Sequence, residues 1–469
     1  MPNNVIGNYT SFKQLWVAKP RTFIQIDTKS SYKTPMEKTK IAIIGLGTVG
    51  TGVAKLLLDH GDRTARHAGR IPWLEKVIVR DLEKPRDVEI PAGVLSDNLE
   101  DIVNDPEIKV VAQLIGGTEP ARTIMLQMLE AGKDVVTANK ALLAEHGAEL
   151  FDRARELDRC IAFEASVAGG IPIVTNIGQC LTGNQITALK GILNGTCNYI
   201  ITQMQQHGTD YQSALKQAQQ LGYAEADPTL DVDGSDTAQK LAILSHLAFG
   251  VRIHWQDIPL EGIESLQLRD IQNADRCGYR IKLLAESKLN GNAVEMNIAP
   301  TLVRKGNPLA EVEDAFNAIR VRGDAVGPVF FHGQGAGQMP TASAVVADII
   351  DTVVGRTRLT FGNLELWSDA QSPRQMAPAD TAVNKYYIRL QVNDDPGVMA
   401  SLTSIIGLHG VSIASINQQQ TQSGDPENTV QLVIMSHATT AGAIKAAADE
   451  LKNSANIKGS PVVMRIMNS

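Results

Sequence analysis

The chain has 469 residues, with 44 Lys+Arg against 51 Asp+Glu and a formal net charge of −7. This balance argues against a protein that binds nucleic acid or another polyanion, and no apolar run approaches the roughly 18–20 residues of a membrane-spanning helix. At roughly 100–200 residues per domain, the length predicts two to four domains. The cysteines form no Cys-x-x-Cys pair, which predicts no disulfide scaffold, no zinc site and a reducing cytoplasm: Cys160, Cys180, Cys197 and Cys277.

The first segment, residues 1–38, shows no helical or strand periodicity. It holds six basic residues against two acidic ones and lacks the continuous apolar stretch of a secretory signal. Its single arginine is atypical of a transit peptide. We therefore expect a disordered or non-native tail, with Met36 as an alternative initiator, and assign it no function.

A glycine-rich turn follows the first apolar run, residues 41–44. Behind it, apolar residues recur at helical spacing, so the turn joins a strand to a helix. In this context G-x-G-x-x-G predicts a dinucleotide site, in which backbone N–H groups and the helix dipole hold a pyrophosphate. A glycine turn without a ligand is the alternative. The predicted cofactor contacts are Gly45, Leu46, Gly47, Thr48, Val49 and Gly50.

The end of the second predicted strand, residues 77–79, bears on the choice of cofactor. It is followed by Arg80 and then Asp81. An acidic residue there pairs with the ribose diol of NAD, whereas an arginine favours the 2′-phosphate of NADP. We assign Arg80 to the cofactor and expect NADP, with NAD use as well left open.

Two further predicted strands, residues 110–115 and 134–137, lead into polar loops. Gly117 and Thr118 follow the first, and Lys140 follows the second. Ligands of open parallel sheets gather at these carboxyl ends, so we assign all three residues to the cofactor site. Thr118 is also expected to cap the helix that begins just after it. A solvated surface lysine is the alternative for Lys140.

The acidic stretch at residues 222–240 predicts a second set of functional residues. Asp236 and Lys240 are four residues apart and therefore neighbours on one helix face. A surface ion pair worth about 0.3–0.5 kcal/mol is the plain alternative. The carboxylates just upstream, including Glu225 and Asp231, favour a site because a small amino-acid substrate needs carboxylates for its ammonium group.

The stretch from Ala218 to Lys240 fits, without a break, the pattern A-x3-G-[aromatic or aliphatic]-[small]-x2-D-P-x2-D-[aliphatic]-x-G-x-D-x3-K. This pattern closely resembles the signature of homoserine dehydrogenases. The resemblance covers roughly residues 39–357 and includes six further ordered motifs. They are the glycine-rich loop, Gly116-Gly-Thr-Glu-Pro120, Ala138-Asn-Lys140, Glu164-Ala-Ser-Val-Ala-Gly-Gly-Ile-Pro172, Gly191-Ile-Leu-Asn-Gly-Thr-Cys-Asn198 and Gly333-Gln-Gly-Ala-Gly-Gln-Met-Pro-Thr341.

The resemblance implies hydride transfer between a nicotinamide cofactor and C4 of aspartate 4-semialdehyde, which gives L-homoserine on the route to threonine, methionine and isoleucine. Reduction leaves an alkoxide that needs a positioned cation and a proton, and a lysine supplies both. By this resemblance Lys240 is the acid/base residue and Lys140 its catalytic and substrate-binding partner. An NADP-binding amino-acid sensor without activity is the alternative. Further implied contacts are Glu225, Asp231 and Asp236 to the substrate and Gly337 to the cofactor.

The loop from Glu164 to Ile171 resembles the family's monovalent-cation site. A carboxylate oxygen of Glu164 and the backbone carbonyls of Val167, Gly169 and Ile171 are the implied ligands, and sodium the implied ion. Hard cations take oxygen ligands of this kind. A tight loop held by one carboxylate is the alternative.

Cys197 allows a different enzyme class, an aldehyde dehydrogenase with a nucleophilic thiolate. That chemistry needs a nearby base, and the closest histidine in the sequence is His207. Because apolar residues follow Cys197 in a predicted helix, we interpret it as a small core residue.

The C-terminal residues 385–469 predict a βαββαβ order. This order, with Asp395-Pro-Gly397 at its first turn, resembles an ACT domain, a module that commonly binds amino acids. Pathway logic makes L-threonine the expected effector, and a dimerisation module without a ligand is the alternative. The candidate effector contacts are Asp394, Gly397, Val398, Asn417 and Gln418.

The predicted fold class is α/β, with a Rossmann-type dinucleotide-binding domain, an α+β substrate-binding domain and an ACT-like domain. The family's pairing of sheets implies a homodimer or homotetramer. The predicted segments are the dinucleotide-binding domain at 39–165, the substrate-binding and dimerisation domain at 166–330, a segment returning to the first domain at 331–360, a linker at 361–384 and the ACT-like domain at 385–469.

Overall fold

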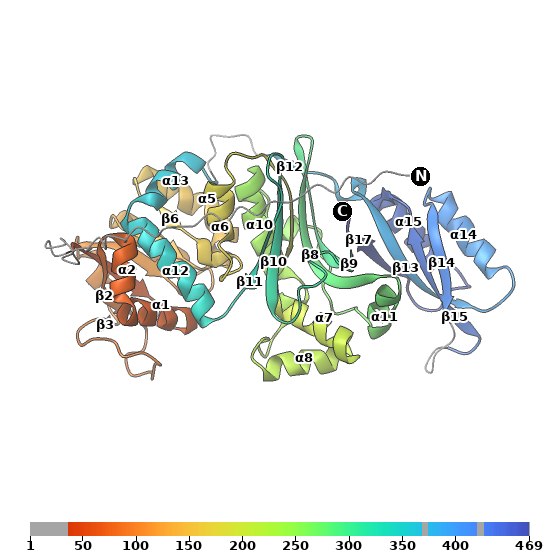
Figure 1. Cartoon of the computed structure of the whole chain (residues 1–469), viewed down its shortest axis with the longest axis horizontal. Helices are drawn as coiled ribbons and strands as arrows, with labels where there is room; N and C mark the ends of the chain where they lie inside the picture. The colour runs from red at the N-terminus through yellow and green to blue at the C-terminus, as the bar shows by residue number, and fades with distance from the viewer. Residues whose placement is uncertain (1–35, 368–373, 420–425, 469) are drawn as a thin grey trace, which may run out of the picture. The chain divides into compact units, whose positions relative to one another are not determined.

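The computed structural model describes residues 36–367, 374–419 and 426–468 (Figure 1). The predicted tail at 1–38 lies outside the described residues except for its last three. The first strand begins at Lys38, three residues before the apolar run that predicted it, because Lys38 and the residues after it already pair with the second strand from Ile71 onward.

The N-terminal sheet has six parallel strands, as the βαβ pattern predicted. Ile41 and Ile43 point to one face of the sheet and Ala42 and Ile44 to the other, and all four are buried. Burial on both faces explains why the strand is a continuous apolar run. The strand order is β3 (Leu95–Ser96), β2 (Ile71–Ile78), β1 (Lys38–Ile44), β4 (Ile108–Gln113), β5 (Asp134–Thr137) and β6 (Ile161–Ala162).

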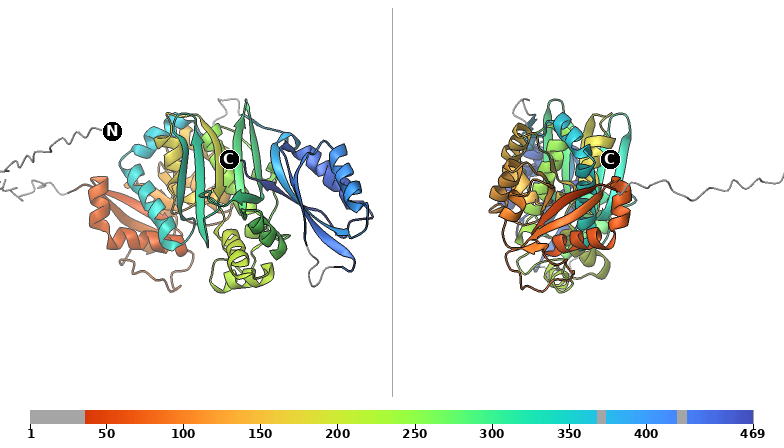
Figure 2. Two further views of the ribbon diagram at one scale, coloured as in Figure 1. Left: turned by 45° about the vertical axis from the view of Figure 1, so that its right-hand side comes forward. Right: turned by 90° about the vertical axis from the view of Figure 1, so that its left-hand side faces the viewer.

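Helices cover both faces of this sheet (Figure 2). One of them, α12 (Gln338–Val353), comes from far along the chain and packs against α1 (Thr48–Asp59). A Cβ on Gly52 would lie 2.9 Å from the Cβ of Ala342, so this close contact requires a glycine. The other helices of the region are α2 (Gly61–Ala68), α3 (Glu100–Val103), α4 (Ala121–Glu130), α5 (Lys140–Glu156), α6 (Ile173–Thr175) and α13 (Arg356–Leu364).

The second sheet runs from the middle of the chain into its C-terminal module without a break. Its two halves meet where β9 and β17 pair in parallel through Arg465 and Thr301. Helices α7 (Gly195–His207) and α10 (Ser235–Phe249) pack against its first half, with α8 (Tyr211–Gln220), α9 (Thr229–Val232) and α11 (Leu268–Arg276) nearby. The strand order is β11 (Gly327–Gln334), β10 (Phe316–Gly323), β7 (Ile186–Ile192), β8 (Tyr279–Asn290), β9 (Ala293–Arg304), β17 (Val462–Ile466), β13 (Val383–Asn393), β15 (Thr429–Ser436) and β14 (Ile413–Gln419).

The C-terminal module has the predicted βαββαβ order, with helices α14 (Val398–Leu408) and α15 (Ala441–Lys452). Strand β13 is buried without interruption from residue 386 to residue 392, although Arg389 and Gln391 are polar. One of its faces packs under α14 and α15, and its other face contacts α11, where Arg389 pairs with Asp270.

The predicted linker at 361–384 contains regular structure. It starts inside α13, and its later part holds β12 (Gln375–Met376), which pairs with β9, and β13 begins at its end. The domain boundaries themselves stay predictions. In the part of the chain that the structure describes, no helix is both long and apolar enough to cross a membrane.

Candidate active site

The glycine-rich loop lies at the carboxyl end of β1 and opens directly into α1. Gly45 has φ +98°, and a Cβ there would approach Ile115 to 2.8 Å. A Cβ on Gly50 would come within 2.1 Å of the Gly45 carbonyl oxygen, whereas one on Gly47 would meet nothing within 4 Å. The N-cap residue of α1 is Gly47, which has no side chain, and in the described residues no side chain caps the first N–H groups of the helix, which leaves them for a ligand. The loop therefore fits the pyrophosphate of a dinucleotide.

Arg80 and Asp81 are exposed beside this loop, and they differ in their contacts. The carboxylate of Asp81 accepts hydrogen bonds from the backbone N–H groups of Glu83 (3.0 Å) and Lys84 (3.2 Å). Arg86 donates to the carbonyl of Lys84 at 2.7 Å and closes the same turn. In the described residues Arg80 has no hydrogen bond or ion pair, so its guanidinium is available to a ligand.

The loop after β4 corrects one prediction. Thr118 does not cap α4, and the N-cap residue of that helix is Pro120, which has no side-chain acceptor. The carboxylate of Glu119, one residue closer to the helix, instead accepts from the hydroxyl of Thr123 at 2.9 Å and from its N–H at 3.4 Å. The loop is held by Asn139, whose amide donates to the carbonyl of Gly117 at 2.6 Å. Asn139 also caps α5 and so fixes the first residue of that helix, Lys140.

Asp236 forms the centre of the predicted catalytic cluster. It lies in the first turn of α10 and is 8% exposed. One carboxylate oxygen lies 2.6 Å from Lys240 Nζ, and the other lies 3.1 Å from Lys140 Nζ. Lys240 Nζ also donates to the carbonyl of Leu193 at 2.7 Å. The two predicted catalytic lysines, which come from different domains of the predicted architecture, therefore meet on one buried carboxylate.

Asn194 connects this cluster to a second carboxylate. It caps α7 by accepting the N–H of Cys197 at 2.8 Å. Its amide nitrogen donates to Asp231 at 2.7 Å and to Asp236 at 2.9 Å. Thr196 holds the other oxygen of Asp231 at 3.1 Å. Asn194 and Thr196 lie in the motif at residues 191–198, where no pattern in the sequence indicated a role for either.

The pKa values of these two carboxyl groups are shifted in opposite directions. Burial alone raises the pKa of Asp236, but the ammonium groups of Lys240 and Lys140 outweigh it and hold the pKa well below its usual range. Burial raises the pKa of Asp231, and the negative charge of Asp236 raises it further. The hydrogen bond from Asn194 acts in the opposite direction but does not outweigh them. The site thus keeps Asp236 ionised and gives Asp231 a higher pKa than an unperturbed aspartate.

A cleft of about 960 Å³ gives solvent and ligands access to this cluster. Glu225 lines this cleft and is exposed, and in the described residues its carboxylate makes no hydrogen bond or ion pair. The start of α12 borders the cleft through Gly337, and the next residue, Gln338, contacts Gly52 behind the glycine-rich loop. Of the predicted site residues, the cleft is lined by Lys140, Gly169, Glu225, Asp231, Asp236, Lys240 and Gly337, and not by residues 45–50, Arg80, Gly117, Thr118, Glu164, Val167 or Ile171.

The predicted cation loop uses its carboxylate in a way that the sequence did not indicate. The two oxygens of Glu164 accept the N–H groups of Val174 (2.9 Å) and Thr175 (2.7 Å), which caps a short helix. Burial raises the pKa of Glu164 despite these bonds. The carbonyl of Ile171 already accepts the N–H of Ile173 at 2.7 Å. With its carboxylate engaged in this way, the loop could offer a cation mainly main-chain carbonyl oxygens. It lines the cleft through Ala165, Ser166, Ala168 and Gly169.

Cys197 is fully buried, and burial raises the pKa of its thiol well above the usual value. Its sulfur donates to the carbonyl of Asp231 at 3.1 Å. A thiol that holds its proton this strongly does not act as a nucleophile. These observations count against the aldehyde dehydrogenase alternative.

The five candidate effector residues do not form one group. Asp394, Gly397 and Val398 lie at the turn from β13 into α14. Asn417 and Gln418 lie on β14 and pair with residues 433 and 432 of β15, which separates them from β13.

Three family models cover most of the chain. "Homoserine dehydrogenase, NAD binding domain" matches residues 45–164, "Homoserine dehydrogenase" matches 172–350, and "ACT domain" matches 386–456. Among curated proteins, a homoserine dehydrogenase of Synechocystis sp. is 41% identical over 92% of this chain and 99% of its own length. One of Bacillus subtilis is 39% identical over 86% of this chain and 93% of its own.

Solved structures agree with these matches. A homoserine dehydrogenase of Thiobacillus denitrificans superimposes with a TM-score of 0.84 at 37% identity, over 92% of this chain and 99% of that one. The glycine-rich loop, the predicted catalytic cluster and the C-terminal module up to residue 456 fall within the matched regions. The chain carries an ACT domain after its catalytic region and belongs to the homoserine dehydrogenase family, whose members are oxidoreductases acting on a CH–OH group.

Proposed function

We propose that this enzyme interconverts L-aspartate 4-semialdehyde and L-homoserine with Lys240 as the proton donor and acceptor. A bound nicotinamide cofactor supplies or accepts the hydride at C4. When the aldehyde is reduced, Lys240 donates a proton to the new alkoxide oxygen, and in the reverse direction it removes the hydroxyl proton. The observation that carries this proposal is the Lys240 ammonium, held between Asp236 and the Leu193 carbonyl at the wall of the cleft.

The other residues of the cluster hold and orient the groups that react. Asp236 holds the two lysine side chains close together, so Lys140 adds positive charge where the alkoxide develops. Glu225 and Asp231 remain for the amino group of the substrate, since both line the cleft. Gly45–Gly50, Gly117, Thr118 and Gly337 surround the place proposed for the cofactor.

The test replaces Lys240 and separates chemistry from binding. We expect Lys240→Ala to lose at least about 100-fold in kcat, the range of a positioned proton donor, and still to bind NADPH as measured by fluorescence titration. Lys216→Ala, an exposed lysine of α8, is the matched control and keeps normal turnover. Near-normal turnover of Lys240→Ala would refute the proposal. No turnover by the unmodified protein with either cofactor would favour the inactive sensor.

The cofactor we propose is NADP. The support is Arg80, which is free at the end of β2 while Asp81 is bound to its own loop. The archaeal homoserine dehydrogenase solved in complex with NADPH has a TM-score of 0.55 at 26% identity. Arg80→Ala should lower kcat/KM for NADP by about tenfold or more, as for a charged hydrogen bond, and leave kcat/KM for NAD nearly unchanged. Equal losses with both cofactors would contradict this role.

A monovalent cation, sodium, is proposed at the loop after β6. Main-chain carbonyls of Val167, Gly169 and Ile171 would hold it, next to the buried charge of Glu164. Hard cations suit oxygen ligands of this type, and the glycine pair lets the carbonyls converge. Thermal unfolding in sodium, potassium and tetramethylammonium chloride at equal ionic strength tests the site. Stabilisation by sodium over tetramethylammonium is expected, and identical curves in all three salts would refute it.

Regulation by L-threonine through the ACT domain and assembly into a homodimer or homotetramer complete the proposal. The support is the appended module with its ligand-binding relatives, and the pathway that the reaction serves, which leads to threonine, methionine and isoleucine. Initial rates with and without threonine test the first point. Light scattering coupled to gel filtration tests the second, and a monomer would contradict it. If threonine changes neither rate nor melting temperature, the module serves assembly alone.

A further inference from the structure

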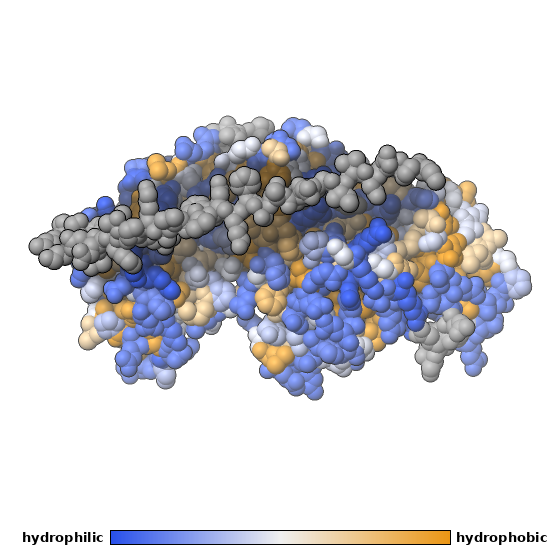
Figure 3. Space-filling view, in the orientation of Figure 1, coloured by the Kyte–Doolittle hydropathy of each residue, from blue (hydrophilic) through white to orange (hydrophobic). Residues whose placement is uncertain are grey.

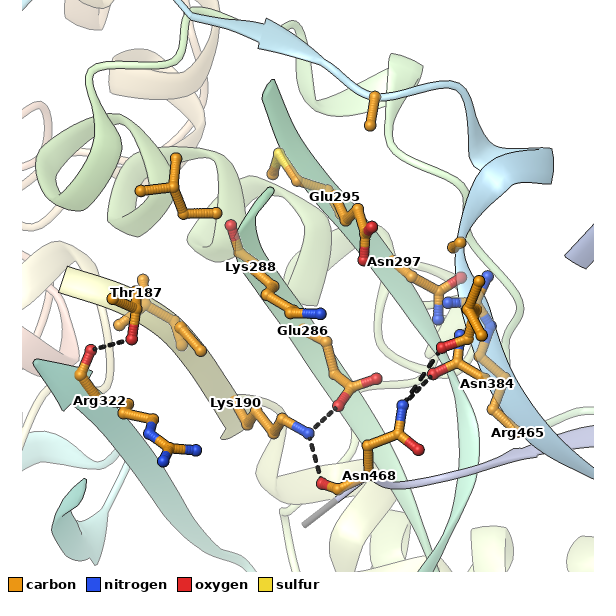
Figure 4. A pocket seen from close by; sticks show the side chains of 18 of the residues that line it. Thr187, Lys190, Glu286, Lys288, Glu295, Asn297, Arg322, Asn384, Arg465 and Asn468 are labelled. Carbon is orange, nitrogen blue, oxygen red and sulfur yellow. Dashed lines mark hydrogen bonds and ion pairs between the residues drawn. The ribbon is translucent and has the colours of Figure 1, made fainter. Parts of the chain in front are cut away.

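A second cavity lies where the catalytic half of the long sheet meets the C-terminal module. Its volume is about 300 Å³, at the small end of the roughly 300–1,000 Å³ of ligand pockets. Strands β7, β8, β9 and β10 form one side, and the segment from residue 377 to residue 384 and the end of β17 form the other (Figure 4). We call it the seam cavity. It is separate from the catalytic cleft, and the two share no lining residue.

The seam cavity has an excess of positive charge that the protein does not neutralise. Lys190 is used within the protein, since it pairs with Glu286 at 3.0 Å and donates to the carbonyl of Asn468 at 2.9 Å. Four other cations of the lining have no ion pair in the described residues. They are Lys288, Arg320, Arg322 and Arg465.

Asn297 adds a buried donor without a partner. Its side chain lines the seam cavity and is 7% exposed, and in the described residues its amide nitrogen has no hydrogen bond. Leaving such a group unsatisfied is unfavourable, so an acceptor on a bound ligand would be stabilised there. In Figure 4, Asn297 and Lys288 lie on neighbouring strands around the Lys190–Glu286 pair. A donor and free cations therefore surround one small space.

Acceptors for a ligand's own donor are present as well. Glu286 and Glu295 line the same cavity, next to the cations. Across the cavity, Asn468 bonds to the side chain of Asn384 at 3.0 Å, so the wall opposite the catalytic strands is the C-terminal module itself. A ligand with both a carboxylate and an ammonium group matches this mixture better than a simple anion does.

We propose that the seam cavity binds a free amino acid. Its carboxylate contacts Lys288 and accepts from the Asn297 amide, and its ammonium faces Glu286 or Glu295. Arg322, two strands away from Lys288 in register, adds positive charge to the same face of the sheet. The site differs from the turn between β13 and α14 where the sequence predicted an effector. The inference goes beyond the hydride-transfer proposal and does not depend on it, because binding is measured without turnover.

The experiment measures thermal unfolding of the full-length protein with each proteinogenic L-amino acid at millimolar concentration. We expect at least one amino acid to stabilise the unmodified protein. The double variant Lys288→Ala/Arg322→Ala, at two exposed positions, should weaken that amino acid's affinity by about tenfold or more. Asn297→Ala should weaken it as well. Arg304→Ala, at an exposed arginine of β9 outside the cavity, is the matched control and should bind normally.

Three results would overturn the inference. The first is that no amino acid stabilises the protein. The second is a stabilisation that persists in the cavity variants, or is lost only in Asn417→Ala, which places the ligand in the catalytic cleft or on β14. The third is that Lys288→Ala/Arg322→Ala changes the oligomeric state in gel filtration while amino-acid affinity is kept, which makes this face an interface between copies. If Asn297→Ala fails to fold, the double variant at exposed positions decides.

Discussion

Asn194 is the residue whose replacement tests the architecture of the site most directly. It makes three hydrogen bonds from a side chain that is 4% exposed: it caps α7, and it donates to Asp231 and Asp236. Loss of a cap costs about 1 kcal/mol, and loss of a hydrogen bond to a charged group costs about 1.5–3 kcal/mol. Asn194→Ala should therefore lower stability by about 3 kcal/mol or more.

Asn194→Asp separates the contribution of the α7 cap from that of the two hydrogen bonds that Asn194 donates. An aspartate keeps the capping oxygen for the Cys197 N–H, but it loses both donors and adds a third negative charge beside Asp231 and Asp236. The new carboxyl has a raised pKa in the folded state, since it is buried among like charges. Its destabilisation is therefore present at neutral and high pH and is relieved as the pH falls through that raised value.

The assay is urea unfolding followed by circular dichroism at several pH values, with KM for homoserine measured in parallel. Asn194→Asp should be less stable than the unmodified protein at pH 8, and the gap should narrow toward pH 5. Its KM should rise as well, because the two carboxylates are no longer held in place. Equal stability of Asn194→Asp and the unmodified protein at pH 8 would show that the donated hydrogen bonds do not organise the site.

Three further predictions concern the burial of side chains elsewhere in the chain. Arg389 Nε lies 2.5 Å from a carboxylate oxygen of Asp270, and both side chains are nearly inaccessible to solvent. Asp270→Asn leaves the buried guanidinium without a counter-charge, so it should lower the free energy of unfolding by about 3–5 kcal/mol. An unchanged melting temperature would contradict this. Burial lowers the pKa of Lys282 to about 8, so as the pH rises this lysine loses its proton in the folded state before it does so in the unfolded state. Between pH 8 and 10 the unmodified protein should therefore gain stability relative to Lys282→Met. Parallel curves of stability against pH for the two proteins would contradict this. Iodoacetamide should label the exposed Cys180 but not the buried Cys197 in the native enzyme, as peptide mass spectrometry would detect.

The parts of the site that lie within one stretch of sequence could be predicted from it. Residues 45–50 specify their own turn, because Gly45 needs a positive φ and Gly50 has no room for a side chain. Asp236 and Lys240 meet because an α-helix places residues four apart on one face. For both features the covalent spacing alone determines the contact.

The parts that depend on packing between segments could not be predicted from spacing. Nothing in the spacing brings Lys140 to 3.1 Å from Asp236, since that contact depends on how α5 and α10 pack. The same holds for Asn194 and its bonds to both carboxylates. The continuous burial of β13 could not be predicted for a related reason, because the buried Arg389 is polar and its partner Asp270 lies on another element. A polar residue that is buried by its partner has the same sequence signal as an exposed one.

The catalytic cluster and the seam cavity use the same two strands. Strand β7 carries Lys190 at the seam and ends one residue before Leu193, whose carbonyl anchors the Lys240 ammonium. Strand β10 carries Arg320, which pairs with Lys190 in register, and also Asn317, which donates to the same Leu193 carbonyl at 3.0 Å. Because paired strands in a packed sheet shift together rather than deform independently, the position of the Leu193 carbonyl depends on the pairing that forms one wall of the seam cavity. A ligand that altered this pairing would act on the proton donor without entering the catalytic cleft.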